Sequence, residues 1–273
     1  MSLVEEADQG DTDPAAPSGV GTWLYCYTDD HWESCSQLSA GDGTDPAILL
    51  VHGQPGSGRL WGALPAHLAR LGKVYSYDRP GWGAHRTSPG DLRYNARWLC
   101  AIADALGGRV VVVGYSYGAA VALEAIAIGC SAIQGLVLVA PAANELAVGP
   151  LDRAFEPAWI SNSTARAAAW GASGRLPGRL ERALLSAHSL AVESGSLRGD
   201  LNGLRNSAAA SVPVAIVAGL ADRTVPPSSV SLLASALGAE EVRWSSTSGH
   251  LLPLRRPRLV AESTAWVLRS VRG

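Results

Sequence analysis

Residues 109–122 read RVVVVGYSYGAAVA, and this stretch decides how the chain folds. Four consecutive valines at 110–113 form an apolar run without a polar face, which is typical of a strand buried on both sides of a parallel sheet. The run ends in Gly-Tyr-Ser-Tyr-Gly at 114–118, after which small and aliphatic residues recur at helical spacing. A strand, a G-x-S-x-G turn and a helix in this order predict a nucleophile elbow, a strained turn that holds Ser116 out of the sheet. The alternative is an ordinary Gly-Ser turn between a strand and a helix.

The composition indicates a globular chain with a large core. The chain has 273 residues, of which 47% are hydrophobic and 17% charged, so it can bury such a core as one domain. A formal net charge of -2 gives no electrostatic footprint for nucleic acid, and no apolar run approaches the length that spans a bilayer. We therefore expect a small-molecule substrate, no nucleic-acid or membrane partner, and a cytoplasmic location. The oligomeric state stays open.

The N-terminal residues 1–19 differ from the rest of the chain. They carry five acids and no base, together with two prolines and two glycines. Such a segment cannot bury enough apolar surface to order itself, so we expect a flexible acidic tail. A secretory signal would need a basic start and an apolar middle, and the segment has neither.

Four cysteines are present, and none of them forms a C-x-x-C pair: Cys26, Cys35, Cys100 and Cys130. Cys100 and Cys130 lie in helical patterns, where a free thiol acts as a small hydrophobic side chain. We expect all four to be reduced, with a bridge between Cys26 and Cys35 as the alternative. We expect neither a metal nor another cofactor.

Strand and helix patterns alternate over most of the chain. Further buried-strand runs stand at 47–51, 74–77, 136–139 and 214–217. Such alternation predicts right-handed βαβ units, and hence the α/β class with a mostly parallel sheet flanked by helices. Residues 143–211 lack a strand pattern and carry alanine-rich segments at helical spacing, which predicts a small helical cap inserted into the core. The core then comprises residues 20–142 and 212–273.

Two further loops after predicted strands carry motifs of their own. His-Gly-Gln-Pro-Gly at 52–56 follows one buried strand, and Gly249-His250 follows the last predicted strand. With the elbow between them, these loops stand in the same order along the chain as in the α/β-hydrolase family, which the chain resembles over about residues 45–270. The resemblance implies an oxyanion hole formed by the backbone N–H groups of Gln54 and Tyr117. Acyl transfer needs such donors because a negative oxygen develops during the reaction.

The elbow order requires an acid and then a histidine after Ser116. His250 lies in a glycine-flanked loop at the same sheet edge as the elbow, whereas His188 lies in a helical pattern inside the cap. Asp222 follows a buried strand at the end where parallel sheets place their ligands, and Glu145 is the alternative acid. We expect Ser116 to act as nucleophile and His250 as general base. Asp222 would orient the imidazole.

The loop Asp-Arg-Pro-Gly-Trp-Gly at 78–83 also resembles the family, with one departure. Ala84-His85 stands where the family pattern ends in serine, so the hydrogen bonding of this loop is in question. We expect Asp78 and Arg79 to brace the loop rather than take part in chemistry. His52, beneath the neighbouring loop, is expected to be structural.

A serine at the elbow narrows the chemistry that the resemblance implies. Relatives similar to epoxide hydrolases and haloalkane dehalogenases carry an aspartate nucleophile there, so we expect acyl transfer to water instead. The hypothesis is hydrolysis of a small, largely apolar ester, thioester or lactone through an acyl-enzyme. Amide or C–C hydrolysis, perhydrolysis and a non-catalytic binding role are the alternatives. The expected substrate pocket comprises Trp61 and Trp82 from the core and Trp159 and Trp170 from the cap.

Overall fold

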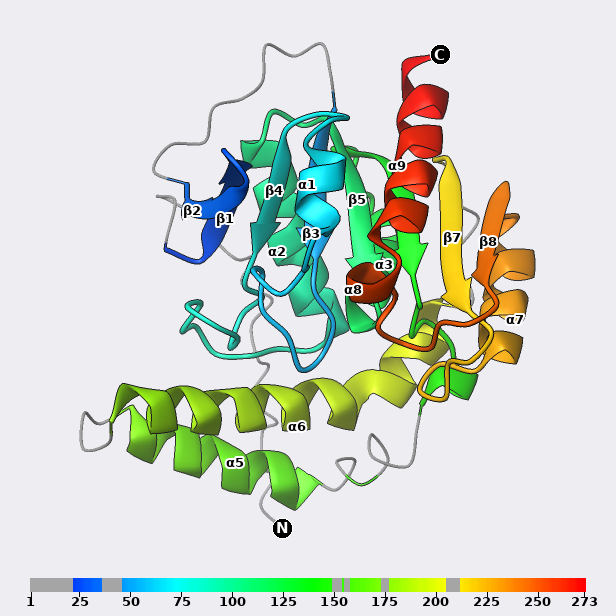
Figure 1. Cartoon of the computed structure of the whole chain (residues 1–273). Coiled ribbons are helices and arrows are strands. Elements are labelled where there is room, and N and C mark those ends of the chain that lie inside the picture. The colour runs from blue at the N-terminus through cyan, green and yellow to red at the C-terminus, as the bar shows by residue number, and fades with distance from the viewer. Residues whose placement is uncertain (1–21, 36–45, 149–153, 155–157, 173–176, 205–211) are drawn as a thin grey trace.

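The computed structural model describes residues 22–35, 46–148, 154, 158–172, 177–204 and 212–273 (Figure 1). The expected tail at 1–19 lies outside these residues. The described part contains an eight-stranded sheet in the order β2-β1-β4-β3-β5-β6-β7-β8. Its strands are β1 Leu24–Thr28, β2 His31–Ser34, β3 Ala47–Val51, β4 Val74–Tyr77, β5 Val110–Tyr115, β6 Ile133–Val139, β7 Val214–Gly219 and β8 Glu241–Ser245. Only the pairings of β1 with β2 and β4 are antiparallel, so the predicted α/β class with a mostly parallel sheet is confirmed.

Helices cover both faces of the sheet. One face packs against α2 Leu92–Ala105, α3 Tyr117–Ala127 and α7 Pro227–Leu237, and the other against α1 Leu64–Leu68, α8 Leu252–Arg255 and α9 Pro257–Arg272. The valines of β5 show why this strand is apolar throughout. Val110 and Val112 belong to the first cluster, and Val111 and Val113 belong to the second. Since neighbouring side chains point to opposite faces, a strand covered on both faces has no position for a polar residue.

The hairpin of β1 and β2 closes one edge of the sheet and carries a disulfide. Asp29 and Asp30 form the turn with φ values of 46° and 61°, a left-handed conformation that aspartate tolerates better than most residues. The hairpin brings the Cα atoms of Cys26 and Cys35 to 5.5 Å, and the two residues form a disulfide. The expectation of four reduced cysteines is therefore wrong for this pair. Cys100 and Cys130 are free thiols.

Two long helices stand between β6 and β7, where the cap was expected. After the short helix η1 Glu145–Ala147 come α5 Ala158–Gly171 and α6 Gly178–Leu204, which pack along each other. Figure 1 shows α6 crossing beyond the carboxyl ends of the parallel strands, with α5 on its outer side. The cap boundaries fall partly outside the described residues and stay a prediction. Among the helices of the described part, none is both long and apolar enough to span a membrane.

Candidate active site

Ser116 stands on a sharp turn between the end of β5 and the start of α3. Its φ of 54° and ψ of -119° are strained for a residue with a β-carbon. The flanking glycines permit this turn because the backbones touch there. A β-carbon at Gly118 would lie 2.2 Å from the carbonyl oxygen of Val51, and one at Gly114 would lie 2.6 Å from that of Gly118. No larger residue fits at either position, so the G-x-S-x-G spacing follows from this packing.

The side chains of Ser116, His250 and Asp222 form a continuous line of hydrogen bonds. His250 Nε2 lies 3.0 Å from Ser116 Oγ, and His250 Nδ1 lies 2.9 Å from Asp222 Oδ2. The other carboxylate oxygen, Oδ1, accepts from the backbone N–H groups of Thr224 at 2.8 Å and Val225 at 2.9 Å. A carboxylate accepts from N–H, so this arrangement assigns the His250 proton to Nδ1 and leaves Nε2 as an acceptor toward the serine hydroxyl.

The three residues come together because each one follows a parallel strand at its carboxyl end. Ser116 follows β5, Asp222 follows β7 and His250 follows β8, and these ends meet at one edge of the sheet. The loops after β7 and β8 are also packed tightly. A β-carbon at Gly219 would lie 2.1 Å from the carbonyl oxygen of Ser248, which leaves only glycine there.

The two alternative residues lie elsewhere. Glu145 is exposed in η1, while the carboxylate that meets His250 belongs to Asp222. His188 lies in α6, where its Nδ1 is 3.2 Å from the hydroxyl of Thr164 on α5, and burial lowers its pKa. The geometry therefore favours Asp222 and His250 over these alternatives.

Tyr115, the residue before the elbow serine, contributes to the site in a way that the sequence analysis missed. Its ring centroid lies 5.3 Å from that of His250. Burial, with a smaller effect of the Asp222 charge, raises the pKa of Tyr115 to about 12. The phenol is therefore neutral, and its ring packs beside the imidazole of His250. The only signal in the sequence is its place next to Ser116.

Gln54 and Tyr117, the residues expected to form the oxyanion hole, both border Ser116. Gly53 packs so closely on the elbow that a β-carbon there would lie 2.9 Å from Ser116 Cβ, and Gln54 follows directly. Tyr117 is the first residue of α3, so its backbone belongs to a helix N-terminus with its partial positive charge. The role of Gln54 and Tyr117 as oxyanion donors stays a prediction.

Asp78 braces the loop after β4, as expected. Its carboxylate accepts hydrogen bonds from the Tyr25 hydroxyl at 2.6 Å and from the backbone N–H groups of Gly58 and Ala84, each at 2.7 Å. His85 supplies a further contact, because its Nδ1 lies 2.8 Å from the Asp78 carbonyl oxygen. The departure at Ala84-His85 thus leaves the loop well bonded.

Arg79 braces the neighbouring loop from within the core. It is fully buried and donates hydrogen bonds to the carbonyl oxygens of His52 at 3.0 Å and Gly53 at 3.2 Å. Burial, and then the Arg79 charge, hold the pKa of His52 well below its usual range, so this histidine is neutral and structural. The partner of Arg79 is Glu193 of α6, which the sequence analysis missed. Its one signal is that it is the only acid between Glu181 and residue 200.

The four expected pocket tryptophans divide into two pairs. Trp61 and Trp82 are 1% and 2% exposed, and their indole N–H groups donate to Ser76 and Glu193 respectively. In this conformation they offer a substrate little surface, so their pocket role stays a prediction. The side chains of Trp159 and Trp170 lie outside the described part of the structure.

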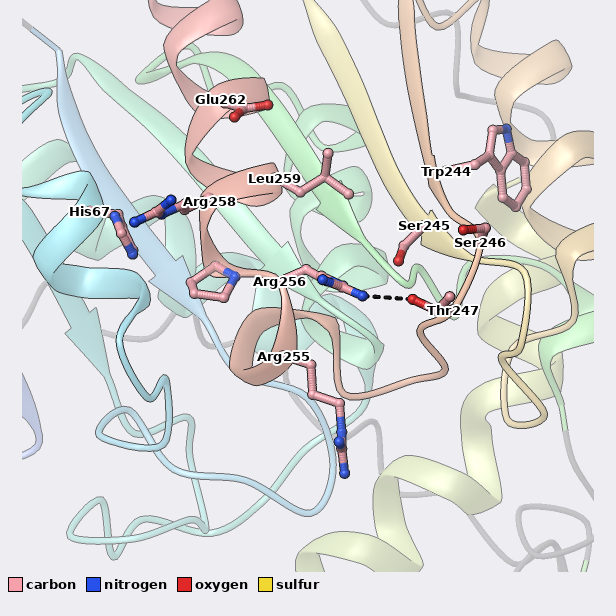
Figure 2. Close-up of a pocket in the computed structure, with 11 residues that line it drawn as sticks. His67, Trp244, Ser245, Ser246, Thr247, Arg255, Arg256, Arg258, Leu259 and Glu262 are labelled. Carbon is pink, nitrogen blue, oxygen red and sulfur yellow. Dashed lines mark hydrogen bonds between the residues drawn. The ribbon is translucent and has the colours of Figure 1, made fainter.

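A surface pocket of about 570 Å³ lies away from the elbow (Figure 2). It stands between α1, β8 and the start of α9, and Ser116, Asp222 and His250 are not among its lining residues. Figure 2 shows Arg256 reaching across it to Thr247, with the two side chains 2.6 Å apart. Among the described residues, no group of three or more His, Cys, Asp or Glu side chains is placed to hold a metal ion.

A mostly parallel sheet with a serine elbow after β5 defines a protein of the α/β-hydrolase type. The chain belongs to the Alpha/beta hydrolase family, whose model matches residues 48–263. The resemblance inferred from the sequence is thereby confirmed.

Proteins named for different activities are similar to this chain in sequence or in fold. Lipase LipV of Mycobacterium tuberculosis is 35% identical over 100 residues, which are 35% of this chain and 37% of the lipase. A haloalkane dehalogenase of Mesorhizobium japonicum is 31% identical over 107 residues, 38% of this chain and 34% of that protein. The chain thus matches only about a third of each of these relatives. The solved structure of a thermophilic esterase from Thermogutta terrifontis is 25% identical with a TM-score of 0.62, over 85% of this chain and 92% of the esterase.

Proposed function

We propose that this chain is a serine hydrolase that cleaves a small, largely apolar ester, thioester or lactone through an acyl-enzyme. The observation that carries the proposal is the hydrogen-bonded line from Ser116 through His250 to Asp222, with distances of 3.0 and 2.9 Å. This line starts at a strained elbow, which is the geometry that a serine nucleophile requires. A lipase and an esterase among the similar proteins agree with it.

The mechanism follows from the roles of the three side chains. His250 Nε2 takes the proton of Ser116 as its oxygen attacks the carbonyl carbon, and Asp222 stabilises the imidazolium that forms. The backbone N–H groups of Gln54 and Tyr117 stabilise the negative oxygen of the tetrahedral intermediate. His250 then gives the proton to the leaving group. Water, activated by the same histidine, hydrolyses the acyl-enzyme and restores Ser116.

The charges around the elbow support an uncharged acyl group. The Asp222 carboxylate is already bonded to His250, and the Arg79 guanidinium is already paired with Glu193. A charged acyl chain would lose its hydration without gaining either partner, since both are engaged. An apolar chain has no such cost, which favours it as substrate.

Two other functions rest on the same fold. C–C hydrolysis or perhydrolysis would use the same nucleophile, and a binding protein would need none of the three side chains. The intact line of hydrogen bonds favours catalysis over binding. Haloalkane hydrolysis, the activity in one relative's name, is not proposed because it requires a carboxylate nucleophile where this chain has Ser116.

The test is labelling by a fluorophosphonate probe, which phosphonylates an activated serine. We expect the chain to be labelled and Ser116→Ala to abolish both labelling and hydrolysis of aryl esters. Ser270→Ala, a change at an exposed serine of α9, serves as the control and leaves both intact. Full labelling of the Ser116→Ala variant would refute the assignment of the nucleophile.

A further inference from the structure

Two adjacent residues of α6 contact the loop that carries Gln54 and the neighbouring loop after β4. Glu193 forms an ion pair with Arg79, in which its Oε2 lies 3.1 Å from Arg79 Nη2 and its Oε1 contacts Nη1. Ser194 Oγ lies 3.0 Å from Gln54 Nε2, which donates to it. Glu193 and Ser194 are themselves 0% and 1% exposed. One turn of α6 is therefore bonded both to the loop after β4, which carries Arg79, and to the loop after β3, which carries Gln54.

Arg79 in turn contacts residues beside both halves of the proposed oxyanion hole. Its Nε and Nη2 atoms donate to the carbonyl oxygens of His52 and Gly53, the two residues directly before Gln54. Its guanidinium also lies 4.7 Å from the centroid of the Tyr117 ring. One buried cation is thus bonded to the backbone just before Gln54 and lies beside the side chain of Tyr117.

The position of Arg79 depends on Glu193. The guanidinium is planar with donors on three nitrogens, and the carboxylate meets the Nη1 and Nη2 atoms together, which fixes its orientation as well as its place. The Nε1–H of Trp82 donates to Glu193 at 3.0 Å, and Asn95 Oδ1 accepts from Arg79 Nη1 at 3.0 Å. Burial raises the pKa of Glu193, an effect that Arg79 opposes.

Stability alone gives little reason for such a pair. Replacing a buried ion pair by well-packed apolar residues is often neutral or stabilising, because removing two charges from water is costly. What the pair supplies here is fixed geometry between a helix and two loops. The Arg79–Glu193 pair has 0% side-chain exposure on both sides, so water does not relax it.

We propose that Glu193 is a positioning residue, which places the backbone of Gln54 and Tyr117 for catalysis through Arg79. Ser194 supports the same loop through the Gln54 side chain. The oxyanion hole is then complete only while α6 is seated on the core, so that α6 links the cap to the chemistry. This inference rests on the proposed serine hydrolase function.

A second ion pair between the same two parts of the chain provides a matched control. Arg86, which follows the β4 loop, pairs with Glu181 in the first turn of α6. Their side chains are 45% and 26% exposed, and neither is bonded to His52, Gly53 or Gln54 in the contacts described above. Glu181→Gln therefore removes one ionic contact between α6 and the core and leaves the contacts of His52, Gly53 and Gln54 unchanged.

The experiment compares kcat and KM for a series of aryl esters in Glu193→Gln, Glu193→Asp, Ser194→Ala and Glu181→Gln. Because a misplacement of about 1 Å costs on the order of a hundredfold in rate, we expect Glu193→Gln to lower kcat by about tenfold to a hundredfold. KM should change little, and the loss should be the same for short and long acyl chains. Glu193→Asp should recover part of the rate, Ser194→Ala should show a smaller loss, and Glu181→Gln should match the original chain.

Two features keep the test decisive. Glu193→Gln leaves the Arg79 charge buried beside a neutral amide, so activity is expressed per folded molecule. If that variant does not fold, Glu193→Asp decides, since it keeps the negative charge and shortens the side chain that reaches Arg79. Unchanged kcat in the folded Glu193 variants would overturn the proposal. A change in KM that grows with acyl length would also overturn it, by placing Glu193 against the substrate. If the unsubstituted protein showed neither hydrolase activity nor probe labelling, that result would instead contradict the proposed function itself.

Discussion

Replacing Asp222 by asparagine exchanges one acceptor atom for a donor, and the structure determines which one. Oδ1 accepts from the backbone N–H groups of Thr224 and Val225, at 2.8 and 2.9 Å. An amide NH2 at that place would face two donors, so the asparagine oxygen occupies it and the NH2 group points at His250 Nδ1. His250 must then accept at Nδ1 and carry its proton on Nε2, the atom 3.0 Å from Ser116 Oγ. In this tautomer it cannot take the serine proton.

The size of the effect follows from the loss of the general base. The same substitution in a serine protease lowers kcat about ten-thousand-fold. For Asp222→Asn we expect a loss on the order of a thousandfold to ten-thousandfold, which corresponds to about 4–6 kcal/mol in the activation free energy at ~1.4 kcal/mol per tenfold. The melting temperature should hardly change, because the bonds of Oδ1 to the two backbone N–H groups are retained.

The assay is steady-state hydrolysis of an aryl ester, with the melting temperature measured on the same preparation. Glu145→Gln serves as the control, since Glu145 was the alternative acid and is exposed in η1. It should leave turnover unchanged. If Asp222→Asn retained more than about a tenth of the original kcat, or if Glu145→Gln lost it, the reasoning from the tautomer would be refuted.

Three further outcomes are expected. His250→Ala should reduce kcat nearly as much as Ser116→Ala, with the double variant little worse than either; additive losses would show that the two act separately. Gly118→Ala should destabilise the chain by more than about 1 kcal/mol and abolish probe labelling, because its β-carbon would lie 2.2 Å from the Val51 carbonyl oxygen, whereas Gly178→Ala should be tolerated since its nearest contact is 3.6 Å away. Across a series of aryl esters, kcat/KM should rise with chain length until the pocket is full. Each methylene should lower the corresponding activation free energy by less than about 1 kcal/mol. An ester whose acyl chain ends in a carboxylate should be poor, and a preference for it would contradict the uncharged-substrate proposal.

Local sequence was sufficient to predict the sheet and the elbow. A strand covered on both faces must be apolar at every position, so the valines of β5 identify it without help from distant residues. The glycines at 114 and 118 are equally direct, because their backbones touch neighbouring carbonyl groups. The order of loops along the chain then brought Ser116, Asp222 and His250 to one sheet edge.

Contacts between distant segments could not be predicted in this way. Glu193 and Arg79 are 114 residues apart, and nothing in the sequence of α6, which also carries Glu181 and Asp200, shows that Glu193 faces inward. Trp82 was expected to line a pocket because it is large and apolar, yet its indole N–H donates to that same acid inside the protein. The Cys26–Cys35 bridge depended on the pairing of the first hairpin, which spacing alone left open.

That hairpin also bears on how the molecule avoids aggregation. An edge strand presents unpaired backbone groups that can recruit a strand from another molecule. Here the outermost strand, β2, is only four residues long and carries Glu33 and His31, whose exposed side chains lie 2.8 Å apart. Such a short, charged edge is a poor template for further pairing, and the bridge to Cys35 keeps it against β1. Releasing the hairpin would uncover the longer and more apolar β1, so we expect reduction of the disulfide to promote self-association.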